Sequence, residues 1–156
     1  MGPTDEDEKY AQECFDLVDS LGVSDIEFTG RVNVKEYLGR MDFTILTSIS
    51  EGQPLTILES YAAHKPTIAT DVGNCRELIY GNDDGFGVAG ILTHIMNLEE
   101  IAQAMIDLAI DPEGREQMGE AGYKRVTSFY RIEQMKETYK EIYRRFAEEQ
   151  QVEWTE

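Results

Sequence analysis

The sequence predicts an α/β fold in which a parallel sheet carries helices on both faces. Short apolar, β-branched runs alternate along the chain with longer runs of helical spacing, and this alternation is typical of parallel sheets. The clearest instance is an apolar run at 43–47, then a loop with glycine and proline, then a helical pattern at 54–63. At 156 residues the chain has the length of one domain and is long enough to bury a sizeable core.

Each element is assigned from its apolar spacing and from the residues that begin and end helices. In chain order, the expected elements are a helix over 5–21 capped by Thr4 and ended by Gly22, a strand over 26–29, a short helix from Asn33 to Gly39, a strand over 43–47, a helix over 54–63, a strand over 67–70, a short helix over 74–80 capped by Asn74, a strand over 88–92, and helices over 98–110, 112–128 and 132–150.

The last expected helix carries one apolar stripe. Its members recur at three- and four-residue steps, and such a stripe predicts packing against a core. The alternative is a stripe that lacks its partner and promotes self-association. The stripe consists of Ile132, Met135, Tyr139, Ile142 and Phe146.

Composition excludes several classes of function. The formal charge of -17 argues against nucleic acid and against an anionic membrane surface, because both require a basic face. No apolar run approaches the ~20 residues of a membrane span, and no signal-peptide pattern opens the chain. Cys14 and Cys75 have no metal or redox spacing, and His64 and His94 lack the company of metal ligands. We therefore expect a cytoplasmic protein without a metal site.

The stretch from Glu51 to Glu59 is the most informative for function. A strand, a tight glycine–proline loop and a helix follow one another there, and the helix N-terminus offers free N–H groups to an anion. Carboxylates only accept hydrogen bonds, and sugar and ribose hydroxyls donate them. A nucleotide sugar, anionic in the middle and rich in hydroxyls on both flanks, fits this arrangement. The alternative is a surface loop whose Glu59 is merely solvated.

Four segments resemble, in the right order, those of retaining GT-B glycosyltransferases of the large GT4-type family. The stretch Glu51–Glu59 with Gly52 and Pro54 is similar to the family's E-x7-E motif. The finer likeness is to the Pel-type exopolysaccharide glycosyltransferases, and the match covers roughly residues 1 to 130. The three flanking segments are Phe28-Thr29-Gly30-Arg31-Val32, the run from Pro66 to Gly73 followed by Glu77, and Met118 to Gly122 followed by Arg125.

This resemblance implies a Rossmann-like, truncated C-terminal domain of a GT-B fold. Residues 1–130 would form a partial donor-binding domain, and residues 131–156 the C-terminal crossing helix and tail. No segment matches the basic pair with which the family binds the diphosphate. We therefore expect an N-terminal acceptor domain as the missing partner, and a fragment that is inactive alone. A second copy of the chain is a further candidate partner, because absent opening strands would leave a sheet edge open.

The resemblance also implies roles for individual residues. The donor would be UDP-glucose, bound without a cofactor or metal, and its hexose would pass to a polysaccharide or other glycan acceptor. Glu59 would accept from the ribose hydroxyls, and Glu51, at the catalytic centre, from the transferred sugar. The remaining donor-binding residues would be Gly52, Gln53, Pro54, Leu55 and Thr56 at the phosphates, and Gly30, Arg31 and Val32 at the base.

The alternative function is an acidic, flavodoxin-like receiver-type module that signals or binds partners without catalysis. A receiver needs a phospho-accepting Asp after a central strand and a Lys after a later one. Asp71 follows an expected strand, but no Lys ends a later one.

Overall fold

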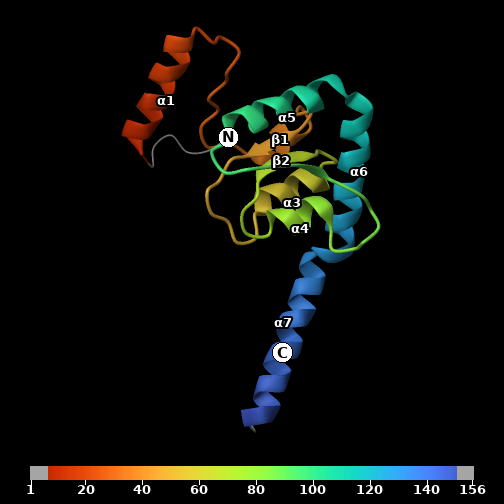
Figure 1. The fold of residues 1–156 in the computed structure, drawn as a ribbon. Helices are drawn as coiled ribbons and strands as arrows, with labels where there is room; N and C mark the ends of the chain where they lie inside the picture. The colour runs from red at the N-terminus through yellow and green to blue at the C-terminus, as the bar shows by residue number, and fades with distance from the viewer. Residues whose placement is uncertain (1–6, 151–156) are drawn as a thin grey trace. The chain divides into compact units, whose positions relative to one another are not determined.

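The computed structural model describes residues 7–150 (Figure 1). The chain divides between Arg40 and Met41 into two compact units. The first unit contains helices α1 (Glu8–Leu21) and α2 (Val34–Leu38). The second contains the sheet and the remaining helices, and therefore most of the fold.

Helix α1 begins later than the sequence predicts. Asp7 is its N-cap, and the Oδ1 atom of Asp7 accepts a hydrogen bond from the Tyr10 backbone N–H at 3.0 Å. Asp7 therefore takes the role expected of Thr4, which lies outside the described residues. The predicted end is confirmed, because Gly22 stops the helix with a left-handed φ of 64°.

The expected strand at 26–29 is wrong. These residues form neither a strand nor a helix, and Ile26 and Phe28 are both exposed by almost half. The Phe28 ring instead packs edge-on against Phe15 of α1, with ring centroids 4.7 Å apart. A β-like run becomes a strand only when a neighbouring strand pairs with its backbone, and the first unit contains none among its described residues.

The second unit is built on a parallel sheet in the order β1-β2-β3 (Figure 1). The strands are β1 (Thr44–Leu46), β2 (Thr67–Thr70) and β3 (Gly90–Thr93). In the register, Ile45 lies beside Ile68, and Ile68 beside Ile91. The predicted strands at 43–47, 67–70 and 88–92 are thus confirmed within two residues, and the parallel sheet with them.

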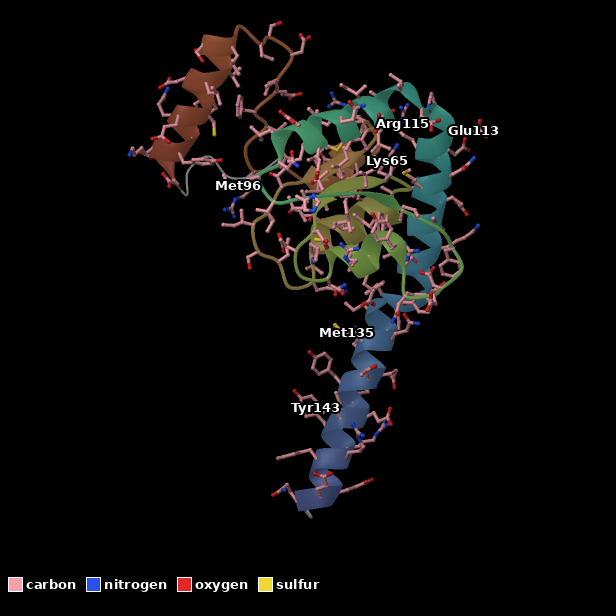
Figure 2. All side chains as sticks on the ribbon, in the orientation of Figure 1. Lys65, Met96, Glu113, Arg115, Met135 and Tyr143 are labelled. Atoms are coloured by element: carbon pink, nitrogen blue, oxygen red, sulfur yellow. The ribbon has the colours of Figure 1, made fainter. Side chains whose placement is uncertain are left out.

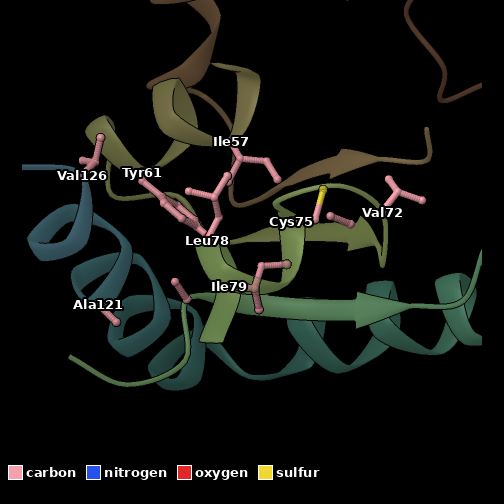
Figure 3. Close-up of a cluster of buried hydrophobic side chains, with 10 residues drawn as sticks. Ile57, Tyr61, Val72, Cys75, Leu78, Ile79, Ala121 and Val126 are labelled. Carbon is pink, nitrogen blue, oxygen red and sulfur yellow. The ribbon is translucent and has the colours of Figure 1, made fainter. Parts of the chain in front are cut away.

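Helices cover both faces of this sheet, as predicted. Successive side chains of a strand point to opposite faces, so Ile68 and Ala69 of β2 belong to two different cores. On one face, α3, α4 and α6 pack with Ala69 (Figure 3), and on the other α5 packs with Ile68. The helices are α3 (Leu55–Ala62), α4 (Cys75–Tyr80), α5 (Leu98–Ile110), α6 (Pro112–Phe129) and α7 (Ile132–Gln150).

Helices α3 and α6 approach each other through a glycine. Gly122 of α6 lies so close to the Tyr61 ring of α3 that a Cβ atom at this position would overlap the ring. Tyr61 is fully buried, and its burial raises the pKa of its hydroxyl above the usual range. This contact fixes α3, and with it the loop that precedes α3, against the body of the second unit.

A buried arginine holds the loop before β3. Arg125 of α6 pairs with Asp84, with 2.6 Å between Nε and Oδ2, and both side chains are nearly inaccessible to water. Its other N–H groups donate to the carbonyl oxygens of Leu78, Ile79 and Gly87. The hydrogen bond from Arg125 lowers the pKa of Asp84. Asp84 therefore belongs to the interior of the unit, whereas its neighbour Asp83 is exposed.

The apolar stripe of α7 does not pack into a core, contrary to our expectation. All five of its side chains are exposed by 45 to 61%. The helix projects from the body of the second unit (Figure 1), and Met135 and Tyr143 stand out from it (Figure 2). The first turns of α7 line a cavity beside α3, but no element within residues 41–150 buries the stripe.

Candidate functional site

The residues that link β1 to α3, which we call the Glu51 loop (residues 47–54), lie at the carboxyl edge of the sheet. In a parallel sheet the chain leaves every strand at the same edge, so this loop meets the residues that follow β2. Gly73 and Asn74, at the start of α4, are those neighbours. The site therefore combines two loops that are about twenty residues apart in the chain.

Glu51 is half-buried in this loop. Its Oε1 atom accepts a hydrogen bond from the Ser48 hydroxyl at 2.7 Å. The Ser48 carbonyl oxygen in turn accepts a hydrogen bond from the Thr70 hydroxyl, at the end of β2. The Ser48 hydroxyl thus sets the direction of the Glu51 carboxylate, and Thr70 of β2 holds the Ser48 backbone in place. The second oxygen of Glu51 stays available as an acceptor.

The backbone after Glu51 lies on the turn that follows β2. Gly73 has a left-handed φ of 51°, and a Cβ atom there would overlap the carbonyl of Glu51. The backbone N–H of Asn74 donates to the Gly52 carbonyl at 3.0 Å, and its side-chain amide donates to Oε1 of Gln53 at 2.7 Å. Position 73 requires glycine, because its backbone is left-handed and a side chain there has no room.

Helix α3 begins at this loop without a capping side chain. Pro54, which is buried, occupies the N-cap position rather than the first helical position that we predicted. The first turn contains no acidic residue, so the N–H groups of Leu55 and Thr56 and the positive end of the helix dipole meet no carboxylate within that turn. The site can therefore accept an anion.

Glu59 lies on the exposed part of α3. It is four residues after Leu55, which is slightly more than one turn into the helix. Residues four apart share a face of a helix, so Leu55 and Glu59 lie on the same side of α3. Leu55 is exposed by 67% and extends the site with an apolar surface beside the carboxylate.

Tyr130 closes the other side of the Glu51 loop. Burial raises the pKa of the Tyr130 hydroxyl, and the nearby charge of Glu77 raises it further, whereas the amide of Gln53 lowers it. The Tyr130 hydroxyl donates to Oε1 of Glu77 at 3.3 Å. A cavity of about 550 Å³ lies next to this contact and is lined by Gln53, Leu55, Leu58, Tyr130, Met135 and Tyr139.

The structure brings most of the predicted site residues together, but it divides the set between the two units. Glu51 to Glu59 lie in the second unit, whereas Gly30, Arg31 and Val32 belong to the first. Gly30 has a left-handed φ of 62°, Arg31 is exposed and Val32 is half-buried. Among residues 7–150, no three His, Cys, Asp or Glu side chains are grouped to hold a metal ion.

Sequence reasoning missed Ser48, Gly73, Asn74 and Tyr130 as parts of this site. Gly73 and Asn74 follow an expected strand, and the shared carboxyl edge of parallel strands could have placed them beside Glu51. Ser48 precedes Glu51 by three residues, a spacing that also allows a local hydrogen bond. No sequence pattern could have indicated Tyr130, because its place beside the Glu51 loop depends on how α6 packs.

No helix in the described part of the chain combines the length and the apolar character needed to cross a membrane.

The chain matches known proteins over most of its length. The sequence profile of the family "Glycosyl transferases group 1" matches residues 1–111. N-acetyl-alpha-D-glucosaminyl L-malate synthase of Bacillus anthracis is 33% identical over 129 residues, which are 81% of this chain and 32% of that protein. The chain spans about a third of the length of the curated relatives it matches.

Solved structures agree in fold. A sucrose-phosphate synthase from Thermosynechococcus elongatus superposes with a TM-score of 0.78 at 20% identity, over 88% of this chain and 34% of the other. Anabaena HepE in complex with UDP-glucose superposes with a TM-score of 0.75 at 20% identity, over 86% of this chain and 38% of the other. The C-terminal domain of the group 1 glycosyl transferase LpcC from Francisella tularensis superposes with a TM-score of 0.67 at 28% identity, over 83% of this chain and 66% of the other. The chain therefore belongs to the glycosyl transferases group 1 family and has the fold of the C-terminal domain of GT-B glycosyltransferases.

Proposed function

We propose that the chain is the donor-binding half of a retaining glycosyltransferase that moves glucose from UDP-glucose to a polysaccharide or other glycan. The observation that carries this proposal is the start of α3. It is a helix N-terminus without a side-chain cap or an acidic first turn, flanked by the carboxylates of Glu51 and Glu59. An anion with hydroxyl-rich groups on either side matches this order of charges.

The N–H groups of Leu55 and Thr56 would hold the diphosphate, together with the backbone of Gly52 and Gln53. Negative charge develops on the diphosphate as the bond to the sugar breaks, and N–H groups fixed by the fold stabilise that charge without having to reorganise. The likeness to HepE, which was crystallised with UDP-glucose, supports the choice of this donor.

The two carboxylates would recognise different parts of the donor. Glu59 would accept hydrogen bonds from the ribose hydroxyls, and Glu51 from the hydroxyls of the transferred glucose. Ser48 already fixes one oxygen of Glu51, which leaves the other for the sugar. The backbone of Gly30, Arg31 and Val32 would contact the base. We assign no protein nucleophile to the retention of configuration.

The receiver-type alternative has less support. Strand β3 ends at Thr93 and is followed by His94, where a receiver would carry its Lys. Titration with magnesium and acetyl phosphate tests that alternative directly, and we expect no response.

The deciding experiment is isothermal titration of the chain with UDP, alone and after Glu59→Gln or Glu51→Gln. UDP keeps the ribose and lacks the sugar, so Glu59→Gln should weaken UDP binding by on the order of 1.5–3 kcal/mol. Glu51→Gln should change UDP binding little and should weaken UDP-glucose binding. Equal effects of the two substitutions on UDP would contradict the assignment, and no binding of UDP by the unmodified chain would contradict the proposed function.

Two further arms refine the result. Magnesium should leave the affinity for UDP unchanged, because we expect no metal in the site. Transfer of labelled glucose to glycan acceptors should be absent for these 156 residues alone, because transfer requires an acceptor held beside the donor. Turnover by the chain alone would overturn that expectation.

A further inference from the structure

Asn74 stands at the start of a helix but does not cap it. It occupies the N-cap position of α4, and its side chain makes no hydrogen bond to the first turn of that helix. Asn97 occupies the same position at α5, and its Oδ1 atom accepts from the Glu100 N–H at 3.2 Å. Asparagine is among the preferred capping residues, so an asparagine that gives up this bond has a different use.

The side chain of Asn74 is directed to the Glu51 loop. Its amide donates to Oε1 of Gln53 at 2.7 Å, and its backbone N–H donates to the Gly52 carbonyl at 3.0 Å. One residue thus holds two consecutive residues of the loop. These two residues connect the Glu51 carboxylate to the start of α3, so their position sets the distance between carboxylate and helix N-terminus.

Gln53 also borders Tyr130. Both residues line the same cavity, and the Tyr130 hydroxyl donates to Glu77 of α4 at 3.3 Å. The Gln53 side chain thus has its amide oxygen on Asn74 and Tyr130 as a neighbour. The loop is therefore fixed at its centre by side chains that themselves need no contact with a ligand.

We propose that Asn74 is a positioning residue, which holds the Glu51 loop in the conformation that binds the nucleotide diphosphate. This inference rests on the proposed function for the identity of the ligand. Asn74 acts through Gly52 and Gln53 and does not touch the nucleotide itself. Gly73 supports the same arrangement, because its missing side chain lets the Glu51 carbonyl lie against the turn.

The test compares two asparagines that occupy equivalent positions. Asn74→Ala should weaken binding of UDP by about two- to tenfold, the range of one lost hydrogen bond, and should leave the thermal midpoint close to that of the unmodified chain. Asn97→Ala should lower the thermal midpoint, because it removes a working cap, and should leave UDP affinity unchanged. A merely structural role for Asn74 predicts the opposite, a lower midpoint with unchanged affinity.

A double-mutant cycle shows whether Asn74 acts through Gln53. If it does, Gln53→Ala should weaken UDP binding in the unmodified chain and have little additional effect in Asn74→Ala. Additive effects would overturn the proposed route.

Amide hydrogen exchange separates this inference from the proposed function. Asn74→Ala should speed exchange of the backbone amides at 51–56, with or without nucleotide, whereas Asn97→Ala should not. Unchanged exchange in Asn74→Ala overturns the positioning role, whatever the chain binds. Faster exchange in a chain that binds no UDP supports the role and contradicts the proposed ligand.

Discussion

The second unit contains two polar networks that differ in how completely their donors are used. Arg125 places its guanidinium on Asp84 and on three backbone carbonyls, and these five hydrogen bonds use every N–H that an arginine offers. At the Glu51 loop, by contrast, the first N–H groups of α3 and one oxygen of Glu51 are left over. A network whose donors are all used stabilises the fold. At the carboxyl edge of the sheet, the unused N–H groups and carboxylate oxygen are available to a ligand.

Removing Arg125 should have the largest effect. Arg125→Met would leave the buried Asp84 without its partner and three carbonyls with one acceptor bond fewer, so we expect a loss of about 3–5 kcal/mol in the free energy of unfolding. The matched control is Arg76→Met, which breaks the more exposed pair with Asp71 and should cost far less, because water screens exposed pairs. Urea denaturation measures both, and similar losses would show that burial does not distinguish the two pairs.

A methyl group at Gly73 should have the next largest effect, and on both stability and binding. Gly73→Ala combines a left-handed backbone with overlap of the Glu51 carbonyl, which together cost about 2–4 kcal/mol. Gly85→Ala is the control, because Gly85 is also left-handed but its Cβ would meet open space, so only about 1 kcal/mol is expected. UDP affinity should fall in Gly73→Ala alone. Equal losses of stability would mean that the contact with the Glu51 loop is relaxed easily.

The smallest of these effects is expected for Asp84→Asn, and it concerns how much stability the chain loses as the pH falls. The pKa of Asp84 is lowered in the folded chain, so its contribution is complete above the unfolded value of about 4 and is lost as the pH falls through the lower, folded value. Thermal midpoints between pH 7 and pH 2 should therefore fall less steeply in Asp84→Asn than in the unmodified chain. Asp83→Asn, at the exposed neighbouring position, is the matched control, and an identical slope in both variants would contradict the assignment.

The elements that could be predicted from the sequence are those whose pattern reports burial directly. Strand β2 is buried at every position and α5 shows a regular apolar stripe, and both were predicted with their observed bounds. The run at 26–29 has the same local character, but its neighbours decide its structure: without a pairing strand, Phe28 packs on α1. Local pattern cannot show whether a partner for the backbone is present.

The parts of the site that lie within one stretch of sequence could be predicted, and the contacts between distant segments could not. The carboxylates of Glu51 and Glu59 and the helix start lie within one stretch of sequence, so their spacing alone indicated them. The contacts of the Glu51 loop with Asn74 and Tyr130 cross from one loop to another and to the end of α6. Asn74 shows the difficulty, because sequence rules assign it to capping, and only its distance from Gln53 reveals its actual partner.

Strand β2 also determines where the chain can tolerate changes of length. Because Ile68 and Ala69 point into different cores, inserting one residue within 67–70 would exchange the two side chains between the faces of the sheet and spoil both cores at once. A residue inserted near 95–97, between β3 and α5, alters no such alternation. Variation in length among related chains should therefore accumulate in the second place and be absent from the first.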